Sequence, residues 1–256
     1  MSKPIIRWMG GKSRLAKTVL PLFPKHTAYI EPFCGGAALF FRKPPAKCEV
    51  LNDINGDLMN LYRVVQHHCD EFVRQFDCIP SSRELFEQWL HAPTAGSTDI
   101  QRAVRFYYIK QNNFGGKDKA QNYGYARTGA SNYRHGKIRA RLGLAHKRLC
   151  GVFIENLPWQ EVFARYDATE SFFYCDPPYY RTSGYRTVFP LAEYQMLAEI
   201  MRTCKGKVLL SVNRHERMCE IFAGFAVHEV QTTYTLDSNN QQQTELLVAN
   251  YDMEVP

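Results

Sequence analysis

The chain contains no hydrophobic run long enough to cross a membrane. None of its apolar stretches nears the length of about 18 residues that a spanning helix needs. The N-terminus also lacks an apolar stretch suited to a secretory signal peptide. Because 45% hydrophobic and 22% charged residues are ordinary values for a folded domain, we expect a soluble, intracellular globular protein with no membrane partner.

The signatures of several cofactors are missing as well. The eight cysteines include no Cys-x-x-Cys pair and have no histidine at zinc-ligand spacing, so we expect free thiols and no metal site. Gly10-Gly11-Lys12-Ser13 looks like the end of a phosphate-binding loop, but Ile6 stands where that loop needs a glycine. Cys34-Gly35-Gly36 lacks the Gly-x-Gly-x-x-Gly spacing of a dinucleotide site. These absences argue against a phosphate-loop protein and against a dinucleotide enzyme.

Acidic residues are nearly absent from one segment. Residues 101–150 carry 12 Lys/Arg and a single acid, Asp118. The rest of the chain carries 20 Lys/Arg and 24 Asp/Glu, so this segment accounts for the positive net charge of +7. One basic segment on a slightly acidic body predicts a surface that binds a polyanion.

Alternating apolar strands and helical segments predict the fold class. The expected strands lie at 28–33, 48–51, 152–156, 172–174 and 208–213, followed by a terminal antiparallel pair at 225–231 and 244–251. We therefore expect an α/β fold: an open twisted sheet, mostly parallel, with an antiparallel edge hairpin and an inserted, mainly helical basic lobe. The boundaries divide the chain into a sheet domain, residues 1–55 and 151–256, and an insert, residues 56–150.

A glycine turn and an acid suggest a bound nucleoside. Gly35-Gly36 follows the first strand, so a ligand can approach the backbone closely there, with a helix expected directly behind at 37–41. Asp53 ends the second strand, 17 residues past Gly36, where nucleoside-binding α/β folds hold ribose hydroxyls. Asp53 is also compatible with a simple helix cap, because an amphipathic helix is expected over 56–77.

The stretch Cys175-Asp176-Pro177-Pro178-Tyr179-Tyr180 carries the expected chemistry. The two prolines make the chain leave its strand as a rigid extended loop, at the strand end where open α/β sheets bind ligands. Asp176 and the carbonyl of Pro177 can accept both hydrogens of a planar amine while Tyr179 stacks on the heterocycle that bears it. A lone Asp-Pro-Pro-Tyr is equally compatible with an ordinary proline turn.

Residues 112–134 are rich in Asn, Gly, Tyr and Arg, and a basic helix is expected at 137–148. Arg and Asn read base edges, Tyr and Phe stack on bases, and Lys and Arg contact phosphates. The residues expected to bind DNA are Asn113, Phe114, Lys117, Tyr123, Arg127, Asn132, Arg134, Lys137 and Arg139.

Taken together, these stretches resemble the Dam-like family of adenine-specific DNA methyltransferases. The resemblance rests on four motifs in the family's order: Arg7-Trp8-Met9-Gly10-Gly11-Lys12, Glu31-Pro32-Phe33-Cys34-Gly35-Gly36, Leu51-Asn52-Asp53-Ile54-Asn55 and Asp176-Pro177-Pro178-Tyr179. The C-terminal Leu246-Leu247-Val248-Ala249-Asn250-Tyr251 also looks familial.

The resemblance implies a Rossmann-like methyltransferase that uses S-adenosylmethionine, with residues 56–150 as its target-recognition domain. It implies double-stranded DNA as the partner, a monomer, and a cytoplasmic, nucleoid-associated protein of a prokaryote or phage. The implied cofactor-binding residues are Trp8, Lys12, Glu31, Phe33, Gly35, Gly36, Asp53 and Asp176. The implied catalytic residues are Asp176, Pro177, Pro178 and Tyr179.

The expected mechanism requires base flipping, because the adenine amine cannot reach a methyl donor inside the stack. Asp176 is expected to orient the amine rather than to deprotonate it, since an ordinary aspartate pKa of about 3.9 is too low for that task. RNA adenine, cytosine N4, a glutamine side chain and an inactive DNA-binding relative remain as alternatives. The stretch Asn113-Phe114-Gly115-Gly116-Lys117 aligns only loosely with the family hairpin that reads GATC. Neither the recognised bases nor a companion restriction enzyme follows from these motifs.

Overall fold

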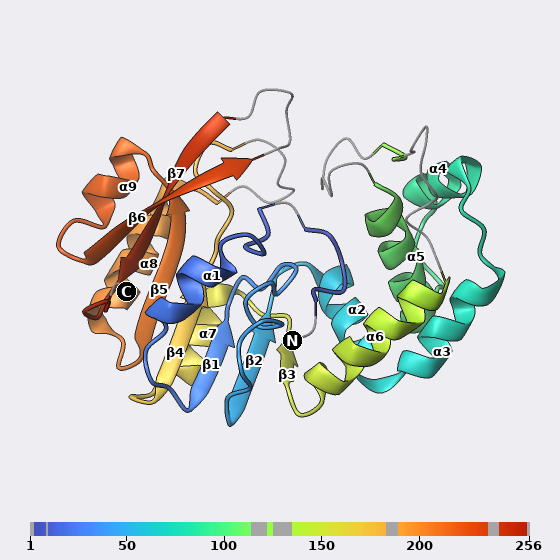
Figure 1. The fold of residues 1–256 in the computed structure, drawn as a ribbon, viewed down its shortest axis with the longest axis horizontal. Helices are drawn as coiled ribbons and strands as arrows, with labels where there is room; N and C mark the ends of the chain where they lie inside the picture. The colour runs from blue at the N-terminus through green and yellow to red at the C-terminus, as the bar shows by residue number, and fades with distance from the viewer. Residues whose placement is uncertain are drawn as a thin grey trace.

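A central mixed sheet organises the molecule. The computed structural model describes residues 3–8, 10–113, 122–124, 135–182, 189–234 and 241–254, and within them it forms a seven-stranded sheet of order β3-β2-β1-β4-β5-β7-β6 (Figure 1). The strands are β1 (Ala28–Glu31), β2 (Cys48–Asn52), β3 (Phe153–Glu155), β4 (Ser171–Cys175), β5 (Lys207–Asn213), β6 (Ala226–Tyr234) and β7 (Gln241–Ala249).

The pairing of these strands confirms the expected α/β class. β1 pairs in parallel with β2 and β4, β2 with β3, and β4 with β5. β7 runs antiparallel to both β5 and β6, so the expected antiparallel hairpin forms that edge. β1 and β4 are therefore neighbours at the centre, where chain connections diverge to the two sides and open α/β sheets bind their ligands.

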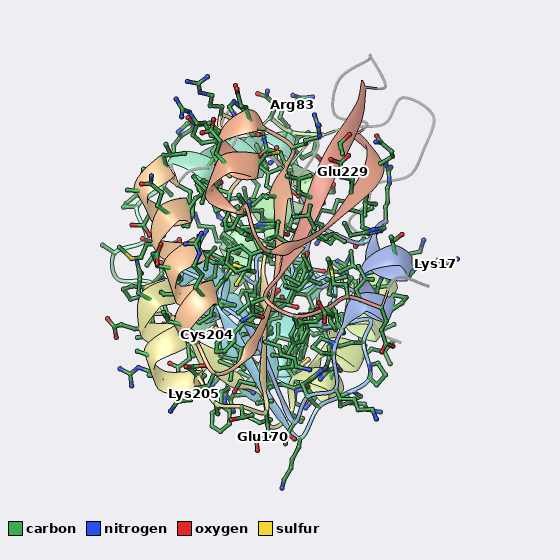
Figure 2. All side chains as sticks on the ribbon, turned by 90° about the vertical axis from the view of Figure 1, so that its left-hand side faces the viewer. Lys17, Arg83, Glu170, Cys204, Lys205 and Glu229 are labelled. Carbon is green, nitrogen blue, oxygen red and sulfur yellow. The ribbon has the colours of Figure 1, made fainter. Side chains whose placement is uncertain are left out.

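Helices cover both faces of the sheet. They are α1 (Ala16–Val19), α2 (Gly56–His67), α3 (Cys69–Arg74), α4 (Arg83–His91), α5 (Asp99–Asn112), α6 (His135–Leu149), α7 (Trp159–Tyr166), α8 (Leu191–Thr203) and α9 (Glu216–Ile221), with 3-10 turns η1 (Leu20–Leu22) and η2 (Gln75–Cys78). The side chains of α7, α8 and α9 pack on one face of the sheet. Side chains fill the space on both sides of the strands (Figure 2).

Strand β4 shows why the sequence folds in this way. All five of its residues are buried, as expected for a central parallel strand that is covered on both faces. Phe173 stacks on Phe163 of α7, with ring centroids 4.2 Å apart, on one side. Phe172 packs against Phe23 on the other side, at 4.7 Å. The strand that leads into Asp176 is therefore held rigidly.

Two of the expected helices differ in the structure. Residues 37–41 form turns rather than a helix, with one helical bond from the Phe41 N–H to the Ala37 carbonyl at 3.1 Å. Pro44 and Pro45 follow three and four residues after Phe41 and prevent the helix from continuing. The single helix expected over 56–77 is also wrong, because His68 has φ −129° and separates α2 from α3.

The helices between β2 and β3 lie beyond the β3 edge of the sheet (Figure 1). Their core is continuous with that of the sheet, since Tyr62, Phe72 and Tyr107 belong to the same buried cluster as Tyr29. Arg148 of α6 donates to both carboxylate oxygens of Glu49 on β2, with the Nη2–Oε1 distance at 2.8 Å. The division into residues 1–55 with 151–256 and residues 56–150 stays a prediction. Among the described residues, no helix has both the length and the apolar character that a membrane crossing needs.

Candidate active site

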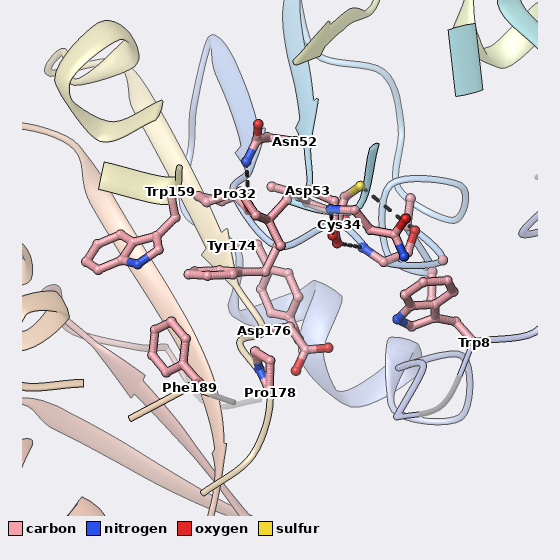
Figure 3. Close-up of a pocket in the computed structure, with 18 of the residues that line it drawn as sticks. Trp8, Pro32, Cys34, Asn52, Asp53, Trp159, Tyr174, Asp176, Pro178 and Phe189 are labelled. Atoms are coloured by element: carbon pink, nitrogen blue, oxygen red, sulfur yellow. Dashed lines mark hydrogen bonds between the residues drawn. The ribbon is translucent and has the colours of Figure 1, made fainter. Parts of the chain in front are cut away.

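A cavity of about 410 Å³ opens at the carboxyl ends of β1, β2 and β4 (Figure 3). Its volume falls in the range of small-molecule and cofactor sites, about 300–1,000 Å³. The predicted residues that line it are Trp8, Lys12, Glu31, Phe33, Gly35, Gly36, Asp53, Asp176 and Pro178. Segments far apart in the chain are therefore brought together in one cavity.

Asp53 shapes the glycine turn. One carboxylate oxygen accepts the Gly35 N–H at 3.0 Å, and the other accepts the Asn55 N–H at 2.9 Å. Gly35 has φ +45°, and a Cβ added there would lie 2.6 Å from Nε1 of Trp8. Only glycine fits this position, because any side chain would be strained by the backbone angle and would collide with the tryptophan.

Trp8 connects the cavity to the helical insert. Its side chain packs over Gly35 and Gly36, and it lines the cavity on one side. Nζ of Lys110 on α5 lies 4.4 Å from the centroid of the Trp8 ring. Lys110 is only 1% exposed, so its cation lies over the aromatic face in a setting that favours cation–π attraction.

Asp176 is paired with Lys12. Nζ of Lys12 lies 2.7 and 2.9 Å from the two carboxylate oxygens, and it also donates to the Gly10 carbonyl at 3.0 Å. The same ammonium lies 4.7 Å from the centroid of the Tyr179 ring. Burial raises the pKa of Asp176 to about 6, although the nearby Lys12 cation opposes the shift. At neutral pH the carboxylate is therefore ionised, and its oxygens can accept hydrogen bonds.

The charge of the cavity lining is predominantly negative. Among the described lining residues the acids are Glu31, Asp53, Asp176 and Glu193, and Lys12 is the single Lys or Arg. Burial raises the pKa of Glu31 to about 8, against the hydrogen bonds from the Tyr29 hydroxyl at 2.6 Å and the Phe40 N–H at 3.0 Å. Glu31 is consequently mostly protonated at neutral pH, and the remaining acids still outnumber Lys12.

The loop after β4 is anchored by its neighbours. Asn213 of β5 accepts the Tyr180 N–H at 3.0 Å and donates to the Tyr180 carbonyl at 3.1 Å. The Tyr194 hydroxyl of α8 donates to the Pro178 carbonyl. Pro177 and Tyr179 are buried beside the cavity, so the predicted catalytic stretch is one fixed unit.

Sequence reasoning missed part of the cavity wall. Ile54 lines the cavity and is 58% exposed, which is unusual for a large apolar side chain. Its position directly after Asp53 could have indicated from the sequence that it belongs to the site. Trp159 and Phe189 form an aromatic wall with Phe33, at centroid distances of 5.9 and 5.5 Å from its ring. Those two residues come from remote segments with no recognisable motif, so only the fold reveals them.

The residues predicted to bind DNA are described only in part. Asn113 and Tyr123 form an antiparallel bridge, and the buried side chain of Asn113 accepts the Asn122 N–H at 3.2 Å. Lys137 and Arg139 lie exposed on α6. Outside the described residues lie Phe114, Lys117, Arg127, Asn132 and Arg134. All of these DNA contacts stay predictions.

The fold and the cavity at its central strand ends define the class of Rossmann-like methyltransferases. Within that class, the chain belongs to the D12 class N6 adenine-specific DNA methyltransferases, whose family model matches residues 8–236. The expected family, enzyme class and DNA substrate are thereby confirmed. The protein is an enzyme that methylates adenine N6 in DNA and requires a methyl donor.

Curated relatives match over nearly the whole chain. The DNA adenine methylase of Haemophilus influenzae is 26% identical, over 95% of this chain and 91% of the relative. The type II methyltransferase M1.LlaDCHI of Lactococcus lactis is 25% identical, over 97% of this chain and 95% of the relative. The type II methyltransferase M.CviBI of Paramecium bursaria Chlorella virus NC1A is 24% identical, over 97% of this chain and the full relative. The matched relatives thus include proteins named as DNA adenine methylases and proteins named as type II methyltransferases.

Proposed function

We propose that the methyl donor is S-adenosylmethionine and that it binds in the cavity at the ends of β1, β2 and β4. The observation that carries the proposal is that every residue predicted for the cofactor site lines this one cavity. When bound, S-adenosylmethionine supplies an electrophilic methyl group on a positively charged sulfur. The acidic lining suits that charge, since opposite charges attract strongly where water is excluded.

The chain's own residues divide the binding task. The Asp53 carboxylate accepts hydrogen bonds from the Gly35 and Asn55 N–H groups, and a carboxylate has about four acceptor positions, so it can also accept from ribose hydroxyls. Ile54 offers an apolar surface beside it for the adenine ring of the donor. Gly35 and Gly36 leave the backbone accessible to the methionine part, with Trp8 behind them. Lys12 supplies a cation for the carboxylate of the methionine part.

Asp176 receives the target amine. Its carboxylate and the Pro177 carbonyl accept the two amine hydrogens, which directs the nitrogen lone pair at the methyl group. The negative charge of Asp176 then stabilises the positive charge that develops on the base. For this, Lys12 must share or release the Asp176 carboxylate with which it forms an ion pair. The proton of the methylated amine passes to water after transfer, and Tyr179 stacks on the flipped base.

The insert of residues 56–150 is proposed as the target-recognition domain for double-stranded DNA. Support comes from its charge and from the exposed Lys137 and Arg139 on α6. We further propose that the enzyme acts as a monomer, since a single chain contains both the cavity and the basic helix. Because its substrate is DNA, we propose the cytoplasm of a prokaryote or phage-infected cell, near the nucleoid, as its location.

Methyl transfer from labelled S-adenosylmethionine to unmethylated duplex DNA tests this function, followed by sequencing that maps N6-methyladenine. Wild-type enzyme should label duplex DNA, and Asp176→Ala should abolish labelling while DNA affinity stays within a few-fold. Asp53→Ala should weaken S-adenosylmethionine binding in a filter or calorimetric assay. Persistent methylation by Asp176→Ala would show that another group receives the amine.

A further inference from the structure

Three buried polar side chains form a hydrogen-bonded series behind the catalytic loop, which we call the Tyr179–Ser211–Glu245 chain. The Tyr179 hydroxyl lies 3.3 Å from Oγ of Ser211 on β5, and Ser211 donates to Oε2 of Glu245 on β7 at 3.0 Å. Ser211 and Glu245 are at most 1% exposed, and Tyr179 is 7% exposed. Three elements distant in sequence thus meet through hydroxyl and carboxylate groups inside the core.

The direction of the hydrogen bonds follows from proton counting. A serine hydroxyl has one proton, and Ser211 gives it to Glu245. Its contact with Tyr179 therefore requires the tyrosine hydroxyl to donate to Ser211. The hydrogen bonds therefore run from the Tyr179 hydroxyl through Ser211 to the Glu245 carboxylate. In a series of hydrogen bonds that leads to an anion, each bond is strengthened.

The ring at the head of this chain faces the reacting centre. Nζ of Lys12 lies 4.7 Å from the Tyr179 centroid, and the same ammonium contacts both oxygens of Asp176. The charge of Glu245 also reaches this centre, because it opposes ionisation of Asp176. A phenol that donates its proton toward an anion has a more electron-rich ring, which attracts a cation more strongly.

We propose that Ser211 and Glu245 are positioning residues for methyl transfer. They act through the Tyr179 hydroxyl, holding the ring in the orientation that stacks on the flipped adenine and favouring the positive charge that develops on the methylated base. This inference rests on the proposed role of the Asp-Pro-Pro-Tyr loop. The alternative is a purely structural role, in which Ser211 and Glu245 only form hydrogen bonds between β5 and β7.

A double-mutant cycle separates the two explanations. Tyr179→Phe and Ser211→Ala should each lower kcat by about tenfold, with the dissociation constant of S-adenosylmethionine unchanged within about twofold. If both changes break the same chain, the double variant should be no slower than the slower single variant. Ser171→Ala is the matched control, because Ser171 is a buried β4 hydroxyl that donates to the Tyr166 carbonyl at 2.6 Å, away from the loop. Its kcat should not change.

A spectroscopic readout reports the stacking directly. A duplex with 2-aminopurine at the adenine that wild-type enzyme methylates should fluoresce more brightly with Ser211→Ala than with wild type, because the base stacks less firmly. Glu245→Gln keeps an acceptor and removes the charge, so its kcat should fall between those of wild type and Ser211→Ala.

An unchanged kcat in folded Ser211→Ala would contradict the positioning role of Ser211 and Glu245. So would a double variant whose fold-loss in kcat is the product of the two single losses. Neither result would affect the proposed site. Should Ser211→Ala fail to fold, an unchanged kcat in Tyr179→Phe or Glu245→Gln would contradict the positioning role as well. Methylation that survives Asp176→Ala would instead reject the site itself.

Discussion

At the scale of single residues, the burial of Asp176, partly offset by the Lys12 cation, sets a pH threshold for the enzyme. The pKa of Asp176 is raised from 3.8 to about 6, so below that pH the carboxyl is protonated and loses an acceptor for the target amine. We expect kcat/KM to fall on the acid side with an apparent pKa near 6. A pH profile of methyl transfer between about pH 5 and 8 measures it.

Lys12→Met provides the matched control for this threshold. The Lys12 cation lowers the pKa of Asp176, so its removal should move the acid limb to higher pH. Residual activity of this variant is sufficient for the comparison, because the position of the limb matters rather than its height. A limb that stays in place would mean that a different group controls the profile.

Glu31 predicts how stability depends on pH. Its pKa in the folded protein is raised from 4.5 to about 8, so its contribution to stability is complete below pH 4.5 and is lost as the pH rises through 8. Glu31→Gln removes this loss and keeps an acceptor for the Tyr29 hydroxyl and the Phe40 N–H. The melting temperature of the variant relative to wild type should therefore increase by a few degrees between about pH 5 and 9. A difference that is independent of pH would contradict a protonated Glu31.

At the scale of structural elements, the turn after β1 tolerates no side chain. Gly35→Ala would place a Cβ 2.6 Å from Trp8 at a backbone angle of φ +45°. We expect S-adenosylmethionine binding at least about tenfold weaker, measured by calorimetry. Gly143→Ala is the control, since a Cβ there meets nothing within 4 Å and the residue lies inside α6. That change should be neutral or slightly stabilising.

Helix α6 is expected to contact DNA phosphates. Replacing Lys137 and Arg139 with alanine should weaken DNA binding at all sequences and reduce the slope of log K against log salt by about one to two. Arg217→Ala on α9 removes an exposed cation far from the insert in sequence and should leave the slope unchanged. Equal slopes in all three proteins would remove α6 from the interface.

The elements also show where sequence reasoning succeeds. Strands β1, β2, β4 and β5 were predictable because each is a short apolar run that ends in a turn residue or an acid. The break at His68 was not, because residues 56–77 keep a helical apolar pattern through it. Trp159 and Phe189 reach the cavity from the start of α7 and from before α8, and neither belongs to a local motif. Their role depends on long-range packing.

At the scale of the whole molecule, the insert and the sheet should unfold together. One buried cluster includes Tyr62 and Phe72 of the insert as well as Tyr29 and Leu247 of the sheet. The Arg148–Glu49 ion pair, with side chains 12% and 5% exposed, adds a second connection, and removing one partner of a largely buried pair is strongly destabilising. Variants that retain either Trp89 or Trp159 as the only tryptophan should show coincident denaturation curves by fluorescence. Separate midpoints would establish two independent folding units.

The acidic excess of the cavity lining has a consequence for turnover. Within the described lining, Asp53, Asp176 and Glu193 face a single Lys12, so the cavity favours a ligand with net positive charge. If the donor is S-adenosylmethionine, as proposed, methyl transfer would convert its sulfonium into an uncharged thioether, and the electrostatic attraction would weaken once the reaction is complete. We therefore expect the demethylated product to bind less tightly than the donor, which would favour exchange after each cycle and limit product inhibition.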